Sequence, residues 1–191
     1  MAHILVIRFS SIGDVAMIVP VVDLLARQYP ENHYTVVSQH FLSPLFAHCP
    51  DNVCFFGVDL YNYKGIPGMY RLYRELLKQK FDAVADLHDV LRTQLLRLFF
   101  YCSGLKVRYI DKGRKEKRQL TRKKNKIFRQ LKPTTGRYTD VFRALGQPVT
   151  LHASFGERQV GLFQSVFGAS RGDFSITICG VIFAIHSVFL L

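Results

Sequence analysis

The segment from Arg8 to Asp14 carries the side chains best suited to chemistry. It reads Arg-Phe-Ser-Ser-Ile-Gly-Asp and follows a short apolar stretch near the N-terminus. Two hydroxyls, a glycine and a carboxylate therefore lie within a few residues of one another. A carboxylate can bind a hydroxyl or accept its proton, and Gly13 has no Cβ, so its backbone can adopt unusual dihedrals and a substrate can come close. This segment is the strongest candidate in the chain for a ligand-binding loop.

The same residue types also have an ordinary structural explanation. Ser10 or Ser11 can cap a helix through its hydroxyl, and Asp14 is favourable in a first helical turn, near the positive end of the helix dipole. Gly13 is the only glycine of the segment, so neither a GxGxxG dinucleotide motif nor a phosphate-binding P-loop is present. The residues alone leave a structural turn and a functional loop both open.

Cysteines and histidines do not indicate a metal site or a bound cofactor. The four cysteines stand at 49, 54, 102 and 179 and form no CxxC pair, and none of the seven histidines forms an HxH or HxxxH pair with a carboxylate nearby. We expect free thiols in a reducing compartment and no cofactor. The N-terminus lacks the basic start of a secretory signal, so the expected location is the cytoplasm.

Apolar segments of strand and helix type alternate along the first three quarters of the chain. Strands are predicted at 4–9, 34–38, 53–57, 81–87 and 106–110, and helices at 15–29, 41–48, 69–80, 90–102 and 138–145. Pro20 is expected to kink or restart its helix, and residues 65–68 to form a loop. This alternation predicts an α/β fold, with a Rossmann-like parallel sheet covered by helices on both faces. In such sheets ligands bind at the carboxyl ends of the strands.

The chain is strongly basic, with a formal net charge of +12. Much of this charge lies in residues 112–132, where Glu116 is the only acidic residue. Such an excess favours an anionic partner, which can be nucleic acid, a phospholipid surface or a phosphorylated or carboxylated substrate. Because the segment has few aromatic residues and no recognisable nucleic-acid module surrounds it, nucleic acid is disfavoured. A solvated surface and contact with an anionic membrane both stay open.

Residues 4–30 resemble the opening of glycosyltransferase family 9, the ADP-heptose:lipopolysaccharide heptosyltransferases. The shared features are a strand, a basic residue, a Ser-Ser-x-Gly-Asp turn and a proline-containing helix that closes on Tyr-Pro. A second matching block runs from Phe81 to Asp89 and is followed by Arg92. The resemblance covers about residues 3–155.

The resemblance implies the N-terminal, acceptor-binding half of a two-domain GT-B glycosyltransferase. Asp14 matches the family's catalytic base, and the reaction is expected to invert the sugar's configuration without a metal ion. The positions implied for acceptor binding are Arg8, Ser10, Ser11, Gly13, His88 and Arg92. Arg8 would bind an acidic group of the acceptor, which is a lipid-linked anionic oligosaccharide at the inner membrane, and the donor is an ADP-sugar.

Residues 156–191 depart from the family pattern. A nucleotide-binding domain takes on the order of 100–150 residues, so the donor-binding domain is expected to be missing and the chain to be truncated and inactive. Residues 174–191 contain no Lys, Arg, Asp or Glu, which suits either a marginal membrane anchor or a chain end altered in reading frame. Besides the truncated transferase, a non-catalytic basic module that binds an anionic glycolipid, a membrane or a partner protein stays open.

Overall fold

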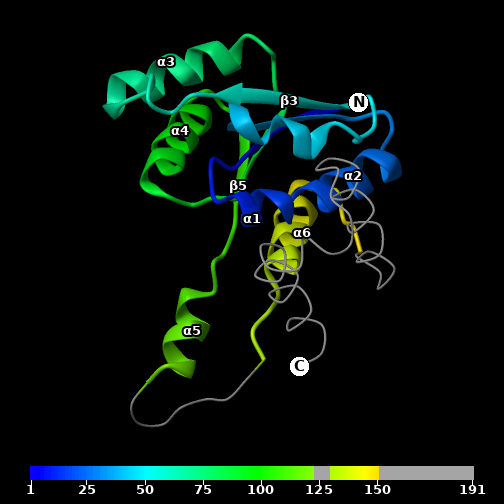
Figure 1. The fold of residues 1–191 in the computed structure, drawn as a ribbon, viewed down its shortest axis with the longest axis vertical. Helices are drawn as coiled ribbons and strands as arrows, with labels where there is room; N and C mark the ends of the chain where they lie inside the picture. The colour runs from blue at the N-terminus through cyan, green and yellow to red at the C-terminus, as the bar shows by residue number, and fades with distance from the viewer. Residues whose placement is uncertain (123–129, 151–191) are drawn as a thin grey trace, which may run out of the picture.

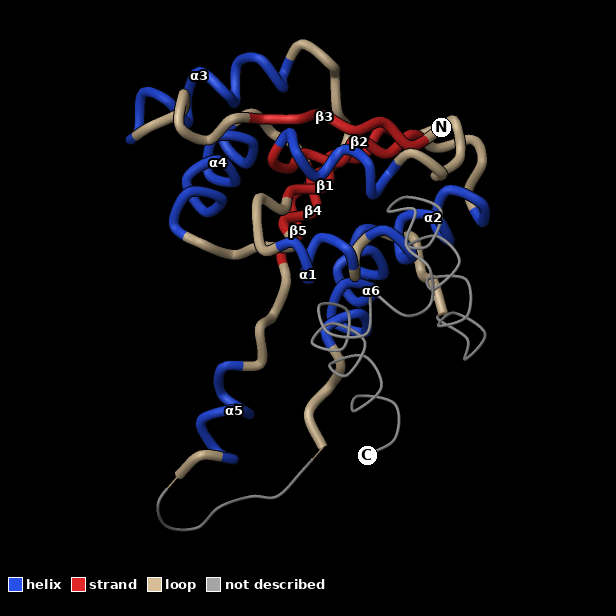
Figure 2. Tube along the Cα trace, in the orientation of Figure 1, coloured by secondary structure: helices blue, strands red, loops and turns tan. Residues whose placement is uncertain are grey.

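A parallel sheet of five strands forms the centre of the molecule (Figure 2). The computed structural model describes residues 1–122 and 130–150. The predicted tail at 156–191 and residues 123–129 of the basic segment lie outside the described residues. The strands, in chain order, are β1 His3–Ile7, β2 His33–Gln39, β3 Val53–Val58, β4 Ala83–Asp86 and β5 Lys106–Tyr109. Their order in the sheet is β3-β2-β1-β4-β5, and all pairings are parallel, as predicted.

Helices cover both faces of the sheet, which confirms the predicted fold class (Figure 1). They are α1 Ile12–Ala16, α2 Val19–Gln28, the 3₁₀ helix η1 His40–Phe46, α3 Gly65–Leu77, α4 Leu91–Cys102, α5 Arg114–Leu120 and α6 Thr134–Leu145. One core contains residues of α1, α2, η1 and α6, and the other contains residues of α3 and α4. Figure 1 also shows α5 extending away from the sheet at the end of a long connection.

Strand β1 is apolar from Ile4 to Ile7 because both of its faces are covered. Ile4 and Val6 face one core, whereas Leu5 and Ile7 face the other. Successive side chains of a strand point to opposite faces, so a strand that is covered on both sides needs apolar residues at every position. The central position of β1, paired with β2 and β4, explains the unbroken apolar run near the N-terminus.

The helix predicted at 15–29 restarts near Pro20, as expected, but its first part begins earlier than predicted. Helix α1 starts at Ile12, and α2 has Pro20 in its first turn, where the missing N–H of proline costs nothing. The predicted loop at 65–68 is the first turn of α3. Gly68 lies so close to Tyr63 that a Cβ would stand 2.4 Å from that backbone, so the glycine serves close packing within a helix.

The chain leaves β1 and β4 toward opposite faces of the sheet. After β1 it enters α1, whose Val15 and Ala16 belong to one core, and after β4 it enters α4, whose Leu96 and Phe100 belong to the other. Adjacent parallel strands whose connections diverge in this way form a topological switch point, where open α/β sheets bind ligands. Among the helices in the described part of the chain, none is both long and apolar enough to span a bilayer.

Candidate functional site

The loops that follow β1 and β4 meet at the switch point. Residues 8–14 follow β1 and contain the segment that the sequence singled out, and residues 87–90 follow β4. Backbone hydrogen bonds tie the start of each loop to a neighbouring strand, since Arg8 N donates to Val37 O at 3.1 Å and Leu87 N donates to Ile7 O at 3.0 Å. The site is therefore built on the sheet edge itself.

Asp14 presents its carboxylate at the start of α1. Its Oδ2 atom accepts hydrogen bonds from the Ser11 hydroxyl at 3.1 Å and the Ser11 backbone N–H at 3.4 Å, and lies 2.5 Å from Nη2 of Arg8. The side chain is 34% exposed. Within residues 1–122 and 130–150, every polar contact of the carboxylate falls on Oδ2. The Oδ1 atom is therefore available to a ligand from solvent.

Arg8 is buried beneath this carboxylate, with a side chain only 7% exposed. Its Nε donates to the carbonyl of Ser10 at 3.0 Å, its Nη1 donates to the carbonyl of Leu87, and its guanidinium faces the ring of Tyr138. We predicted that Arg8 would bind an acidic group of a ligand. In the structure its N–H groups instead donate to oxygen atoms of the protein. The guanidinium therefore holds Asp14 and links the loops after β1 and β4.

Tyr138 brings α6 into the site. Its hydroxyl donates to the backbone carbonyl of Asp14 at 3.3 Å, and burial raises the pKa of the phenol. The ring is fully buried in the core beside α1. The sequence predicted a helix here but gave no signal that its tyrosine supports Asp14, because the two residues are brought together only by the fold.

His88 lies nearby, with only 9% of its surface exposed. Its Nε2 is 3.3 Å from the Ser10 hydroxyl, while its Nδ1 is buried without a hydrogen-bond partner in the described part of the chain. Burial, followed by the positive charges of Arg8 and Lys112, lowers the pKa of His88 to about 4. At neutral pH the imidazole is uncharged, so it can exchange a hydrogen bond with the Ser10 hydroxyl or with a sugar hydroxyl.

Asp86, the last residue of β4, shapes the turn that carries His88. Its Oδ1 accepts hydrogen bonds from the backbone N–H groups of His88 at 2.9 Å and Asp89 at 3.0 Å, and its Oδ2 pairs with Arg97 at 3.3 Å. The carboxylate is fully buried, and burial raises its pKa. Asp89 has φ +45°, a left-handed conformation that aspartate tolerates better than most residues. Asp86 thus fixes the backbone beneath His88.

Arg97 and Lys112 are parts of this arrangement that the sequence analysis missed. Arg97 also lies 3.5 Å from Asp89, and Nζ of Lys112 donates to the backbone carbonyl of Asp89 at 3.1 Å. Burial is the main cause that lowers the pKa of Lys112. Arg97 follows Arg92 by five positions in α4, so helix geometry places the two side chains on different faces. That spacing could have indicated a separate role for Arg97. No local spacing indicates that Lys112 approaches Asp89, because the sheet brings the two residues together.

Most of the predicted site residues come together, with two differences. Arg92 is exposed on the first turn of α4, and no hydrogen bond or ion pair joins it to the group among the residues the structure describes. Gly13 lies inside α1, and its φ is not among the positive values of the described glycines. The expectation that Gly13 provides an unusual backbone conformation was wrong, since a helical turn uses ordinary dihedrals.

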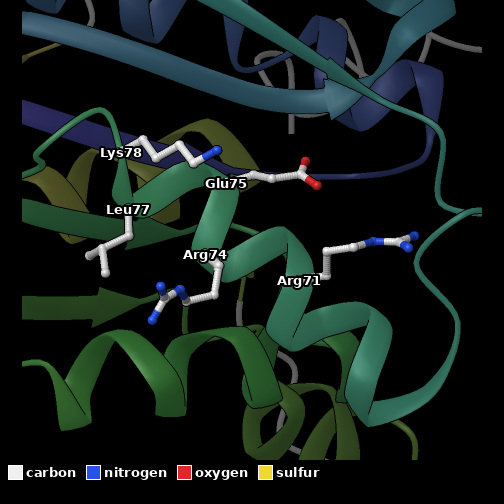
Figure 3. A pocket seen from close by; sticks show the side chains of 5 residues that line it. All are labelled: Arg71, Arg74, Glu75, Leu77 and Lys78. Carbon is white, nitrogen blue, oxygen red and sulfur yellow. The ribbon is translucent and has the colours of Figure 1, made fainter.

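Two other features of the described residues were checked for ligand chemistry. Residues 1–122 and 130–150 contain no group of three or more His, Cys, Asp or Glu side chains close enough to hold a metal ion. A surface hollow of about 550 Å³ lies along α3 and is shown in Figure 3. It is lined by Arg71, Arg74, Glu75, Leu77 and Lys78. Four of the five belong to α3 and Lys78 directly follows it, so the hollow is not part of the switch-point site.

Solved structures of family 9 glycosyltransferases match this chain over most of its length. One from Veillonella parvula DSM 2008 is 21% identical, with a TM-score of 0.55, 88% of this chain covered and 51% of the other. The ADP-heptose lipopolysaccharide heptosyltransferase II of E. coli is 20% identical, with a TM-score of 0.50 and the same coverage of 88% and 51%. The chain has the fold of about half of a family 9 glycosyltransferase.

The similarity is one of structure at low sequence identity. Neither the known family models nor the curated proteins gave a match to the sequence. The chain spans about half the length of the solved structures that it resembles. The parallel sheet with helices on both faces therefore matches the GT-B architecture that the resemblance of Ser10 to Asp14 implied.

Proposed function

We propose that this domain is the acceptor-binding half of a family 9-type glycosyltransferase that extends a lipid-linked, anionic oligosaccharide of the lipopolysaccharide core. The observation that carries the proposal is the carboxylate of Asp14. It stands at the switch point with Oδ2 held by Arg8 and Ser11, and Oδ1 left for a ligand. The structural match to a family 9 glycosyltransferase and to heptosyltransferase II supports this assignment.

In the proposed reaction Asp14 acts as the general base. Its Oδ1 accepts the proton of an acceptor hydroxyl while that oxygen forms a bond to the anomeric carbon of the donor sugar. The bond from this carbon to the phosphate oxygen breaks at the same time, and ADP leaves with both electrons. A single displacement of this kind inverts the anomeric configuration and forms no covalent sugar–enzyme intermediate.

The surrounding residues bind and orient the acceptor. The hydroxyl of Ser10 and the neutral imidazole of His88 form a polar pair beside Asp14. Arg8 holds Oδ2 of the Asp14 carboxylate in place through an ion pair. Arg92, exposed on the first turn of α4, can bind a carboxylate or phosphate of the acceptor. Ser11 and Gly13 complete the loop.

The donor half of the reaction is assigned to a second domain. The matched structures are about twice as long as this chain, and the described residues show one sheet. We propose that the ADP-sugar binds to that second domain, that this chain alone transfers little or no sugar, and that the reaction takes place at the cytoplasmic face of the inner membrane. Transfer from ADP-heptose by the purified chain would contradict this division.

Acceptor binding is tested with the whole chain. A de-acylated lipopolysaccharide core oligosaccharide is titrated while the ring resonances of His88 are followed by NMR. We expect shifts at His88 that saturate, and weaker binding in Asp14→Asn. The matched control is Asp51→Asn, which removes an exposed carboxylate in a turn away from the site. Equal binding by the two variants would remove Asp14 from the acceptor site.

Catalysis is tested in a chimera that joins residues 1–150 to the donor half of heptosyltransferase II. We expect Asp14→Asn to lower heptose transfer by about 10²–10⁴-fold, the usual contribution of a general base. Asp51→Asn should leave transfer unchanged. An Asp14→Asn chimera with full turnover would overturn the proposed role of Asp14 as the general base. Acceptor binding would still be decided by the NMR titration.

A further inference from the structure

The outer side of helix α4 carries a line of apolar residues that the sheet does not cover. Leu91, Leu95, Leu98 and Cys102 follow one another at intervals of four, three and four residues, which places them along one side of the helix. Leu91 and Leu98 are 82% and 54% exposed, Cys102 is exposed and Leu95 is half-buried. The opposite side of α4 packs in the core. We call the four outer residues the α4 stripe.

A helix that is apolar on two sides is normally buried on two sides. Helices at the surface of globular proteins turn polar and charged residues to water, and exposed apolar residues usually occur singly. The α4 stripe instead continues from the first turn of the helix to its last, and Tyr101 beside it is 70% exposed. The pattern indicates that a partner packs on this side of α4.

The α4 stripe leads away from the proposed acceptor site. Helix α4 joins β4 to the parallel strand β5, so it runs from the carboxyl edge of the sheet back to the amino edge. It also covers the face of the sheet opposite to α1 and α6 (Figure 1). Leu98 and Cys102 therefore lie in the half of α4 that is farther from the loop of Asp14. A donor-binding domain that faces the carboxyl edge would leave them exposed.

Residues 174–191 of the same chain have the composition that this stripe requires. They contain no Lys, Arg, Asp or Glu, so they can pack on apolar side chains without burying a charge. Val149, at the end of the described residues, lies in the core on the other face of the sheet. Residues 151–173 connect the two parts and can span up to about 75 Å when extended. Since packed layers are only about 10 Å apart, this connection is long enough to pass around the sheet.

A second copy of the chain fits the α4 stripe less well. Arg92 is exposed on the same helix, and Arg74 and Lys78 are exposed on α3 and at its end, beside α4. Pairing of two copies through the stripe would bring these like charges together, which opposes association. Residues 174–191 add no such charge, and their tether keeps them at a high local concentration beside the domain.

We infer that residues 174–191 fold back on the domain and cover the α4 stripe. The apolar segment is then an internal partner of α4, which shields Leu91, Leu98 and Cys102 from water. This contact requires neither a sugar donor nor an acceptor, so it goes beyond the proposed transfer reaction and does not depend on it.

The natural cysteines allow a direct test in the full chain. Cys102 belongs to the α4 stripe and Cys179 to the apolar segment, whereas Cys54 is exposed on β3, at the opposite edge of the sheet from β5. A bismaleimide with a short spacer joins two thiols that lie close together, and mass spectrometry of the digested protein identifies the pair. We expect Cys102 and Cys179 of one chain to be joined about tenfold more often than Cys54 and Cys179. Equal yields for the two pairs would overturn the inference.

A matched pair of variants tests whether the stripe itself makes the contact. Leu98→Glu puts a charge at an exposed position of the stripe and should lower the yield of the Cys102–Cys179 product about fivefold. Phe41→Glu is the control, since Phe41 is 63% exposed on η1, which packs on the other face of the sheet. It should change the yield less than about twofold. Circular dichroism checks that both variants are folded. The same yield in both would contradict the contact.

The absence of tryptophan from the chain permits a second measurement. Phe183→Trp places one reporter in the apolar segment, and we expect its emission to be shifted to the blue in dilute protein without lipid. Adding Leu98→Glu should shift it back to the red. Emission that turns blue only when phosphatidylglycerol vesicles are added would overturn the inference by assigning the segment to a membrane. Products that join Cys102 of two chains would overturn it by assigning the stripe to a second copy.

Failure of this inference and failure of the proposed function give different results. Asp14→Asn should form the Cys102–Cys179 product as the unchanged chain does, because it leaves the α4 stripe intact. Leu98→Glu should bind the core oligosaccharide normally in the NMR titration. Loss of the crosslink result would therefore leave Asp14 in its proposed role.

Discussion

Two histidines at opposite ends of the sheet have opposite surroundings. His3, at the amino edge, has a partner for each ring nitrogen, since Nδ1 lies 3.2 Å from the carbonyl of Gln79 and Nε2 lies 2.8 Å from the hydroxyl of Thr35. His88, at the carboxyl edge, has one long contact to Ser10 and a buried Nδ1 with no partner among the described residues. Burial is the largest cause that lowers the pKa of each ring.

The difference shows which end of the sheet has polar atoms without a hydrogen-bond partner in the described part of the protein. Buried polar atoms in proteins are almost always hydrogen-bonded, so an unpaired one is unusual and costs stability. The amino edge obeys this rule at His3. The carboxyl edge departs from it at His88 and leaves Oδ1 of Asp14 to solvent, while buried charges at Arg8 and Asp86 hold the loops. This contrast supports the proposal that the ligand binds at the carboxyl edge.

The largest effect is expected from removing the buried guanidinium of the carboxyl edge. Arg8→Met should destabilise the fold by about 2–3 kcal/mol, because the carbonyls of Ser10 and Leu87 and the carboxylate of Asp14 all lose a charged donor. Urea unfolding measures the change. The control is Arg27→Met, an exposed ion pair with Asp23 that should cost less than about 0.5 kcal/mol. Equal losses would show that Arg8 is not a structural clamp.

The second test sharpens the contrast by titration. NMR should give His88 a pKa near 4 against an ordinary value of 6.5. Lys112→Met should raise the pKa of His88, because it removes a nearby positive charge, and should leave His3 unchanged. In the folded state His88 stays neutral where the unfolded chain binds a proton, so its contribution to stability is complete above pH 6.5 and falls as the pH drops toward 4. An ordinary pKa at His88 would contradict the contrast drawn between its surroundings and those of His3.

The smallest expected effect is the difference in stability between removing His3, whose two ring nitrogens have partners, and removing His88, whose Nδ1 has none among the described residues. His3→Leu should cost about 1–2 kcal/mol, because the backbone carbonyl of Gln79 and the hydroxyl of Thr35 each lose a hydrogen bond. His88→Leu should change stability by less than about 0.5 kcal/mol, since it also removes the unpaired Nδ1. Thermal unfolding of both variants provides the measurement. A larger loss at residue 88 than at residue 3 would mean that His88 is retained for stability.

Much of the fold was predictable because its signals are local. The apolar run before Arg8 predicted a strand covered on both faces, and Pro20 predicted a break between two helices. The first turn of α3 was missed because the Gly-Ile-Pro-Gly sequence of residues 65–68 is typical of loops, and only the contact of Gly68 with Tyr63 explains a helix there. The assignments of Asp14 and His88 as site residues stay predictions.

The sequence by itself determined the strands, most of the helices and the turn in which Ser11 and Asp14 lie together, since residues three apart meet in a first helical turn. Only the tertiary structure decided which distant side chains surround that loop. Arg8 reaches Leu87, Tyr138 reaches Asp14, and Lys112 reaches Asp89 because parallel strands bring their carboxyl ends to one edge. The physical reason is that strand pairing and helix packing set these distances, and no local spacing of residues encodes them.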